Sequence, residues 1–257
     1  MRLTRTMRGS TAVYATLLSV ILGAGTAAAG DAYDTAVTNA ARPAGDHKRD
    51  AIDHPADMLR LAGIKPGGRV ADILGGDGYY SELASYVVGP KGHVLFMNNT
   101  AFDGWSEGWQ QRIANNRLPN VEHKTLPLDA MNLGTGTLDA VLLVKVYHDM
   151  YWEDAKNGWP KVNVPKVLDQ LAAALKPGGT LLLIDHSAKA GTGTADAGPL
   201  HRIDEAFARK DFEAHGFELV GQSDLLRRPD DKRDQISYKP PAFGKTDKFV
   251  MVFRKKA

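Results

Sequence analysis

Two acid–histidine pairs are the residues of this 257-residue chain best suited to chemistry. They are His148-Asp149 and Asp185-His186, and each follows an apolar run typical of a buried strand. An imidazole titrates near neutral pH and can remove a proton from a reacting group while a carboxylate orients it. We predict His148 as a general base oriented by Asp149 or Asp185, with His186 as a second candidate. The alternative is that one or both histidines only hydrogen-bond to loop backbone.

The same imidazoles and carboxylates are also ligands for several divalent ions. A metal-dependent hydrolase or lyase is therefore a further interpretation of these pairs. Adjacent residues seldom both point at one ion without help from the turn, so no metal ligand is assigned from the sequence.

A second group of candidates lies near residues 188–199, a segment rich in Gly, Ala and Thr that is either a lid or simply disordered. Arg202 follows it, and its planar guanidinium can bind a carboxylate or phosphate with two hydrogen bonds. An ion pair with Asp204 or Glu205 would use the same group. Aromatic residues after position 146 form either a wall for a ring-bearing substrate or ordinary core; they are Tyr147, Tyr151, Trp152 and Trp159. The predicted substrate-binding residues are Tyr151, His201 and Arg202.

A glycine-rich turn at residues 74–78 is the clearest sign of a ligand site. It separates an apolar run from a helical pattern that begins at Tyr79, and its glycines let a ligand approach the main chain. A dinucleotide site needs a third small residue for close packing. The series that begins at Gly76 reaches Ser81 only after two tyrosines, which disfavours NAD. The predicted cofactor contacts in this region are Asp72, Gly75, Gly76 and Gly78.

Apolar runs and helical periods alternate along most of the chain. Continuous apolar runs such as residues 138–144 suit central parallel strands. Strands are expected at residues 69–73, 93–97, 121–124, 138–144, 180–185, 217–220 and 248–253, and helices at 54–64, 79–87, 105–113, 164–175 and 204–214. The pattern predicts an α/β fold with a doubly wound, mostly parallel, seven-stranded sheet and an antiparallel last strand.

Ligands of such sheets bind outside the carboxyl ends of the strands, near the point where the strand order reverses. Asn98 and Asn99 end the second expected strand, and Asp129 follows the third. We expect them to line a nucleoside pocket together with the glycine turn. The two acid–histidine pairs end the fourth and fifth strands, so they should face the floor of the same pocket.

Residues 1–29 have the pattern of a cleaved secretory signal, with three arginines, an apolar run at 12–24 and small residues up to Ala29. The run is shorter than the ~20 residues of a membrane-spanning helix. We therefore expect export, to a bacterial periplasm, and no stable membrane insertion after cleavage. Residues 30–53 are interpreted as an N-terminal arm and residues 54–257 as one α/β domain.

The composition restricts the remaining classes of protein. The chain has no cysteine, which excludes disulfides, thiolate metal sites and cysteine nucleophiles. Loss of the arginines in residues 1–29 changes the net charge from +2 to −1, so charge gives no reason to expect a nucleic-acid partner. The sequence does not specify an oligomeric state.

Several motifs, in order, resemble those of the class I S-adenosylmethionine-dependent methyltransferases, and the likeness covers about residues 57–255. Residues 70–78 resemble the first motif of the family, residues 138–141 its fourth strand, and residues 175–181 the turn into its fifth. Leu128-Asp129-Ala130 resembles the acid after the third strand. The resemblance implies a Rossmann-like methyltransferase fold and S-adenosylmethionine as cofactor. It also implies that Asp129 accepts from the adenine amino group, with Ala130 beside it.

Finer details, at residues 147–149 and 201–204, resemble a group of predicted exported bacterial methyltransferases. Two positions depart from the pattern of the wider family. Leu74 stands where the first glycine usually lies, and Asn98 or Asn99 replaces the acid that accepts hydrogen bonds from the ribose hydroxyls. An amide lacks the charge that makes such bonds roughly twice as strong. Asn98 is kept as a predicted cofactor contact, but a weaker one.

The sequence therefore predicts an S-adenosylmethionine-dependent methyltransferase that acts on a small-molecule acceptor. In methyl transfer the sulfonium provides the leaving group, so the protein aligns the reactants and removes a proton. The alternative is an exported binding protein that keeps the fold without methyl transfer. Leu74, Asn98 and the cytosolic origin of the donor support that alternative.

Overall fold

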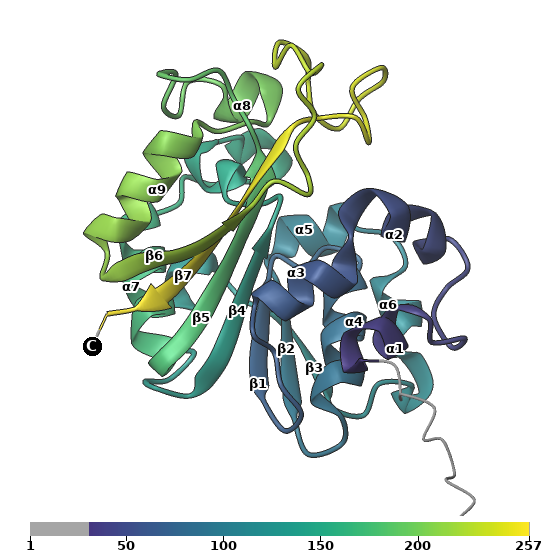
Figure 1. Ribbon diagram of the computed structural model, residues 1–257. Coiled ribbons are helices and arrows are strands. Elements are labelled where there is room, and N and C mark those ends of the chain that lie inside the picture. Colours follow the sequence, from purple (N-terminus) through teal and green to yellow (C-terminus); the bar gives the residue numbers. More distant parts are fainter. Residues whose placement is uncertain (1–30, 257) are drawn as a thin grey trace, which may run out of the picture. The chain divides into compact units, whose positions relative to one another are not determined.

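A seven-stranded sheet organises the part of the chain that the computed structural model describes, residues 31–256 (Figure 1). The signal expected at residues 1–29 lies outside it. The strand order is β3-β2-β1-β4-β5-β7-β6. Successive strands are added on one side of β1 up to β3 and on its other side from β4, so the strand order reverses between β1 and β4. The strands are β1 (Arg69–Ile73), β2 (His93–Asn98), β3 (Val121–Thr125), β4 (Leu138–Val144), β5 (Leu175–His186), β6 (Phe217–Ser223) and β7 (Lys248–Lys255).

The strand directions confirm the predicted doubly wound sheet. Strands β1 to β5 are mutually parallel, whereas β7 runs antiparallel to both β5 and β6. Strand β5 begins earlier than expected because Leu175 pairs with Leu138 before an irregularity in the register, and regular pairing resumes at Thr180. The first five strands therefore bring their carboxyl ends to one edge of the sheet.

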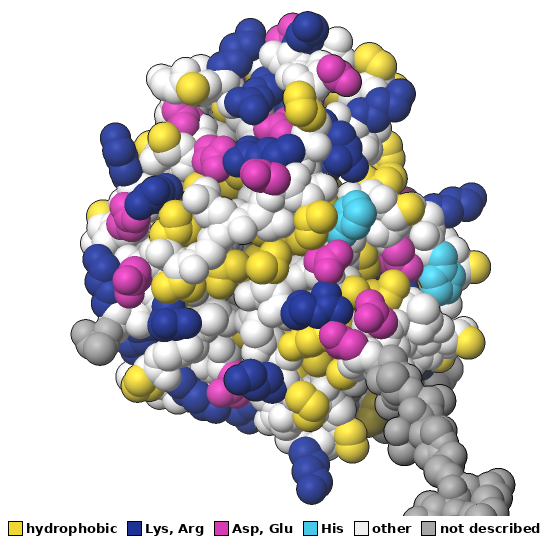
Figure 2. All heavy atoms as spheres, viewed as in Figure 1, with side chains coloured by type: hydrophobic (Ala, Val, Ile, Leu, Met, Phe, Trp, Pro, Cys, Tyr) yellow, Lys and Arg dark blue, Asp and Glu magenta, His cyan; other side chains and the backbone are white. Residues whose placement is uncertain are grey.

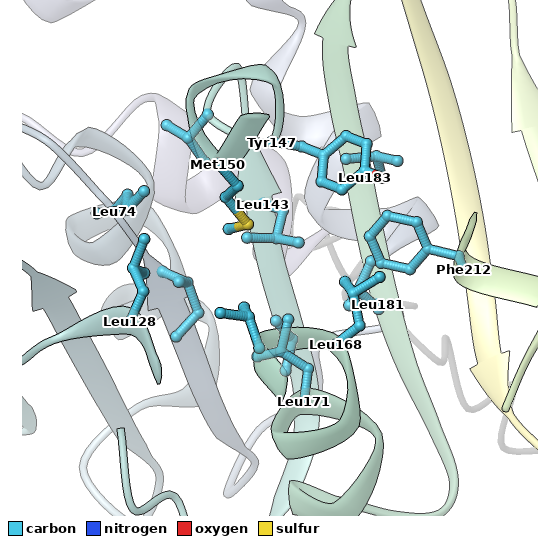
Figure 3. Close-up of a cluster of buried hydrophobic side chains, with 14 of the residues drawn as sticks. Leu74, Leu128, Leu143, Tyr147, Met150, Leu168, Leu171, Leu181, Leu183 and Phe212 are labelled. Atoms are coloured by element: carbon cyan, nitrogen blue, oxygen red, sulfur yellow. The ribbon is translucent and has the colours of Figure 1, made fainter. Parts of the chain in front are cut away.

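Helices cover both faces of this sheet (Figure 1). One buried cluster joins Val70 and Leu142 to α1, α3 and α4, and another joins Ala71 and Leu143 to α7 and α9. Figure 3 shows part of the second cluster, where Leu181 lies beside Phe212. The alternation of strand residues between two apolar layers is what a buried parallel sheet requires. These helices are α1 (Ala32–Val37), α3 (Pro55–Leu61), α4 (Tyr79–Val88), α7 (Val164–Ala174) and α9 (Glu205–Ala214).

The connections at the carboxyl edge are short helices. The single helix expected at 105–113 is two helices, because Asn99 caps the first by accepting from the Phe102 N–H and Gly108 starts the second at φ 86°. The remaining helices are α2 (Asp46–Asp53), α5 (Thr100–Trp105), α6 (Trp109–Ile113) and α8 (Ala197–Leu200), with 3₁₀ turns η1 (Ala114–Asn116), η2 (Leu128–Ala130), η3 (His148–Tyr151) and η4 (Ala155–Asn157).

The segment interpreted as an N-terminal arm contains α1 and α2. Helix α2 is attached to the sheet edge by Asp53, whose carboxylate accepts from Lys145 Nζ at 2.8 Å. Arg42, which precedes α2, binds Asp50 of the same helix through two hydrogen bonds of 2.9 and 2.7 Å. Polar residues therefore fix this segment against the edge where ligands of such sheets bind.

The surface carries both signs of charge. Figure 2 shows Lys and Arg side chains interspersed with Asp and Glu over the visible face, with hydrophobic side chains between them. Within residues 31–256, none of the helices combines the length and apolar character needed to cross a lipid bilayer.

Candidate active site

The glycine turn leaves β1 in a left-handed backbone conformation. Leu74 has φ 54°, followed by φ 65° at Gly76 and 81° at Gly78. A residue with a Cβ adopts this conformation at a cost of roughly 1–2 kcal/mol, which explains why glycine is usual at such a turn. The buried Leu74 side chain offsets this cost by packing into the core, where it lies beside Leu128 (Figure 3).

Asp72 supports this turn from below. Its carboxylate is buried and accepts from Ser81 Oγ at 2.7 Å, at the start of α4. A Cβ on Gly75 would lie only 2.7 Å from Asp72 Oδ2, so the turn passes directly over the acid. Burial outweighs the Ser81 hydrogen bond and raises the pKa of Asp72 to about 6. The structure thus places this predicted cofactor contact beneath the turn.

Asn98 holds the same turn from the side. Its Oδ1 accepts from the Gly76 N–H at 3.0 Å, and its Nδ2 donates to the Gly76 carbonyl at 2.9 Å and to Asp103 Oδ1 at 2.8 Å. The side chain is fully buried. An amide has two N–H donors and one oxygen, so these bonds engage each of its polar atoms. Asn98 therefore fixes the position of Gly76 and has little capacity left for a ribose.

A cavity of about 340 Å³ opens beside Asp129, between the ends of β2 and β3. Ligand pockets in proteins begin at about 300 Å³, so this space suits a nucleoside. The Asp129 carboxylate lines it and makes no hydrogen bond or ion pair to residues 31–256, while the neighbouring Ala130 is exposed. The other lining residues are Asn99, Thr100, Ala101, Pro127, Leu128, Gly158, Pro160, Lys161 and Val162.

The histidine cluster at the ends of β4 and β5 joins residues far apart in the chain. His148 Nδ1 lies 2.7 Å from Asp185 Oδ1, and the His148 backbone N–H donates to Asp185 Oδ2 at 2.9 Å. On its other side, His148 Nε2 lies 3.2 Å from Asp149 Oδ1 and 3.3 Å from His201 Nδ1. The structure therefore brings together three of the predicted catalytic residues and adds His201, predicted as a substrate contact.

Charge controls the protonation of this cluster. Burial lowers the pKa of His148, but the Asp149 and Asp185 carboxylates outweigh it and raise the pKa to about 10. His148 therefore carries a proton at neutral pH and would first have to lose it to act as a general base.

His186 lies outside the cluster and lines a second cavity. Its Nδ1 is 2.8 Å from Thr246 Oγ1, and burial lowers its pKa well below the ordinary value. The cavity, about 470 Å³, extends from α2 to residues 237–248. Its lining residues are Gly45, Lys48, Arg49, Ile52, Asp53, Lys145, His186, Ser237, Tyr238, Phe243, Gly244, Thr246 and Lys248.

Lys145 is the residue of this cavity that sequence reasoning missed. It follows β4 directly, with φ 62°, and burial together with the positive charge of Arg49 lowers its pKa to about 8 despite its bond to Asp53. Such a left-handed non-glycine residue at a strand end is typical of functional sites. The signal in the sequence is a lysine immediately after a continuous apolar run.

The other predicted substrate contacts are held inside the protein. Arg202 is fully buried and binds Asp231 through Nη1 at 2.7 Å, so its guanidinium is not directed to the pocket. The Tyr151 hydroxyl donates to Asp211, and Tyr151 is half-buried. The segment at 188–199 is attached by Asp204, which accepts from two of its glycine N–H groups at 2.6 and 3.3 Å.

Comparison with solved structures identifies the fold. A methyltransferase from Aquifex aeolicus, described as dependent on S-adenosylmethionine, superposes with a TM-score of 0.57 at 20% identity, over 80% of this chain and 92% of that one. An arsenic(III) S-adenosylmethionine methyltransferase from Chlamydomonas reinhardtii gives 0.55 at 17% identity, over 88% and 74%. The [4+2]-cyclase SpnF gives 0.55 at 14% identity, over 79% and 82%. The fold is that of the class I S-adenosylmethionine-dependent methyltransferases, as the sequence motifs predict.

A sequence relative points to the same class. The ubiquinone/menaquinone biosynthesis C-methyltransferase UbiE of Hydrogenovibrio crunogenus is 25% identical over 130 residues, which are 50% of this chain and 46% of that protein. The match thus spans about half the length of this curated relative. No family model matches the chain.

The residues present fit the donor at two of the three places that the sequence resemblance implies. The cavity beside Asp129 has the size of a nucleoside and an unpaired acceptor for the adenine amino group. Gly76 is partly exposed, and a Cβ there would meet only Ser106 Oγ, at 3.7 Å, so a ligand can approach this main chain. The ribose position is the exception, because the Asn98 amide is already engaged.

Proposed function

We propose that this protein is an S-adenosylmethionine-dependent methyltransferase that acts on a small-molecule acceptor. The observation that carries the proposal is the unpaired Asp129 carboxylate in a nucleoside-sized cavity at the carboxyl edge of the sheet. An unpaired acceptor in such a place gains a hydrogen bond when an adenine amino group enters. The sequence match to a C-methyltransferase supports the same assignment.

The donor, when bound, supplies a methyl group on a sulfonium that needs no protonation to leave. Asp129 accepts from the adenine amino group, and the bare main chain at Gly76 lets the rest of the donor lie close to the turn. Asn98 acts on the donor through the turn, because its hydrogen bonds keep Gly76 in place. These residues align the donor, which is the main contribution a protein makes to this reaction.

The acceptor occupies the cavity that contains Lys145 and His186. Arg49 connects the two regions, because it lines this cavity and lies 3.7 Å from Asp77 of the glycine turn. With its pKa lowered to about 8, Lys145 is partly neutral near physiological pH and can take a proton from the acceptor. Several Lys and Arg side chains line the cavity, so an acceptor with an acidic group fits it.

A second candidate function is a binding protein that has the fold but transfers no methyl group. The engaged Asn98 favours it, because the ribose hydroxyls lose a charged acceptor. The cyclase SpnF, which has this fold, is described by another reaction. We also propose export to a bacterial periplasm from the pattern of residues 1–29; recovery of the chain in the cytoplasmic fraction only would contradict it.

Calorimetry of donor and product binding tests the proposed function. The full chain is titrated with S-adenosylmethionine and with S-adenosylhomocysteine, alongside Asp129→Ala. We expect micromolar binding that weakens at least about tenfold in Asp129→Ala, since a hydrogen bond to a charged group contributes roughly 1.5–3 kcal/mol. Asp224→Ala is the control, because the Asp224 side chain is 93% exposed and outside both cavities. Absence of binding to the wild-type chain, or equal binding by Asp129→Ala, would overturn the proposal.

A further inference from the structure

We propose that His148, Asp149 and His201 form a binding site for a divalent first-row transition-metal ion. Each of them offers one ligand atom, and the three atoms, His148 Nε2, Asp149 Oδ1 and His201 Nδ1, lie next to one another. The site is distinct from the cavity beside Asp129 and from the cavity around Lys145, neither of which these residues line.

The spacing of the three ligand atoms is that of a coordination sphere. His148 Nε2 lies 3.2 Å from Asp149 Oδ1 and 3.3 Å from His201 Nδ1, and the last two atoms are 3.1 Å apart. Ligands at about 2.1 Å from one ion are separated by about 3.0 Å in an octahedron and about 3.4 Å in a tetrahedron. The observed separations of 3.1 to 3.3 Å lie between these values.

Asp185 orients the first imidazole for this role. Its Oδ1 lies 2.7 Å from His148 Nδ1, which keeps a donated proton on Nδ1, so that Nε2 is the nitrogen that gives up its proton to the ion. Carboxylates hold metal-ligating histidines in this way in many proteins. Asp185 is itself fixed, because it also accepts from the backbone N–H groups of His148 and His186.

His201 is held in place by a strained backbone and a buried neighbour. It has φ 49°, a left-handed conformation that a non-glycine residue keeps only where the surrounding structure determines it. Arg202 provides that constraint, with hydrogen bonds to Asp231 at 2.7 Å and to the Ser187 carbonyl at 3.0 Å. The same side chain that the sequence suggests as a substrate clamp therefore positions His201.

The ligand set defines the class of ion and leaves room for chemistry. Two imidazoles with one carboxylate suit zinc, iron, cobalt or nickel, whereas magnesium and calcium prefer oxygen ligands. The His201 side chain is 16% exposed, so the cluster reaches the surface at this residue. Three protein ligands leave at least one coordination position for water or for an oxygen or nitrogen atom of a bound molecule.

The two acidic side chains also make the cluster electrostatically suited to a cation. Asp149 and Asp185 both contact His148, and the ion would take the position now bridged by protons. A bound divalent ion is the largest local charge in such a site and compensates both carboxylates.

Metal titration of the full chain tests this site without any methyl acceptor or donor. The chain is dialysed against a chelator and titrated with Zn²⁺ by calorimetry and with Co²⁺ by visible absorption. We expect one ion per chain, and a loss of at least about tenfold in affinity for His201→Asn, since even residues that only support metal ligands contribute 10–100-fold. Asparagine is chosen because it tolerates the left-handed backbone.

His54→Asn is the matched control. His54 also has a left-handed backbone, with φ 45°, but it is not part of the cluster. The control should bind the ions as the wild-type chain does, and circular dichroism verifies that both variants fold. Absence of stoichiometric binding by the wild-type chain would overturn the proposal whatever the variants do. Equal binding by folded His201→Asn would also overturn it.

Discussion

The two halves of the carboxyl edge of the sheet differ in how their polar groups are paired. On the side of β1, β2 and β3, main-chain and amide groups bind one another, and a single carboxylate, on Asp129, lines a cavity without a partner among residues 31–256. On the side of β4 and β5, carboxylates surround an imidazole and compete for its protons. The first side is a hydrogen-bonded frame around a ligand-sized space, whereas the second is a cluster in which two carboxylates share one cationic imidazole.

Removing the cation from the charged side should have the largest effect. His148→Leu removes the cationic partner that the buried Asp149 and Asp185 share and leaves them only His201 and backbone N–H groups, so we expect a loss of about 3 kcal/mol in the free energy of unfolding, measured with urea. His215→Leu is the control, because His215 pairs with Asp169, whose side chain is 69% exposed, and such pairs contribute about 0–1 kcal/mol. Equal losses in both variants would show that charge does not distinguish this cluster.

The side of β1, β2 and β3 should respond in the opposite direction when its buried acid is replaced. Because the folded-state pKa of Asp72 is raised to about 6, its stabilising contribution is present below the unfolded pKa, near 4, and is lost as the pH rises through 6. Asp72→Asn should therefore be more stable than the wild-type chain at pH 8, by about 3 kcal/mol, with the gap roughly halved at pH 5. Urea unfolding at both pH values measures this gap, and a destabilised variant at pH 8 would contradict the assignment.

The same variant sharpens the comparison of the two sides. Asp72 supports the glycine turn from beneath, so Asp72→Asn should still bind S-adenosylhomocysteine. A loss of binding as large as that of Asp129→Ala would instead make Asp72 a direct contact, as the sequence predicts.

The smallest expected effect is a shift in the pH at which Lys145, directly after β4, loses its proton. With a pKa of about 8, half of this amine is neutral at pH 8, whereas an ordinary lysine, with pKa near 10.4, is almost entirely protonated. Competitive acetylation followed by peptide mass spectrometry should give a labelling midpoint near pH 8 for Lys145. A midpoint near 10 would remove Lys145 as the proposed base, without affecting the donor cavity or the metal site.

The sequence predicts those features that depend on neighbouring residues. The seven strands, the antiparallel last strand and the turn at 74–78 follow from local apolar runs and glycines, and the structure confirms them. The position of Asp129 after the third strand and its likeness to a family motif predict a ligand contact, and Asp129 lines a cavity. Short-range patterns carry this information because strands and turns are determined over a few residues.

Features that depend on distant residues escaped prediction. His201 meets His148 across 53 positions, and this contact requires the left-handed backbone of His201 and the burial of Arg202. Lys145 reaches Asp53 across 92 positions, in a polar segment without helical periodicity in the sequence. The full engagement of Asn98 also needs the fold, since its residue type alone suggests a free amide.

The hydrogen bonds between Asn98 and Gly76 affect how fast a ligand can bind. Because the Asn98 amide hydrogen-bonds to both the N–H and the carbonyl of Gly76, the turn has its final conformation before a ligand binds. A ligand then spends none of its interaction energy on ordering this loop, and association need not wait for a conformational step. The Gly76 amide hydrogen should accordingly exchange with solvent only when the turn opens. Its exchange rate therefore reports how often the turn opens at this edge of the sheet.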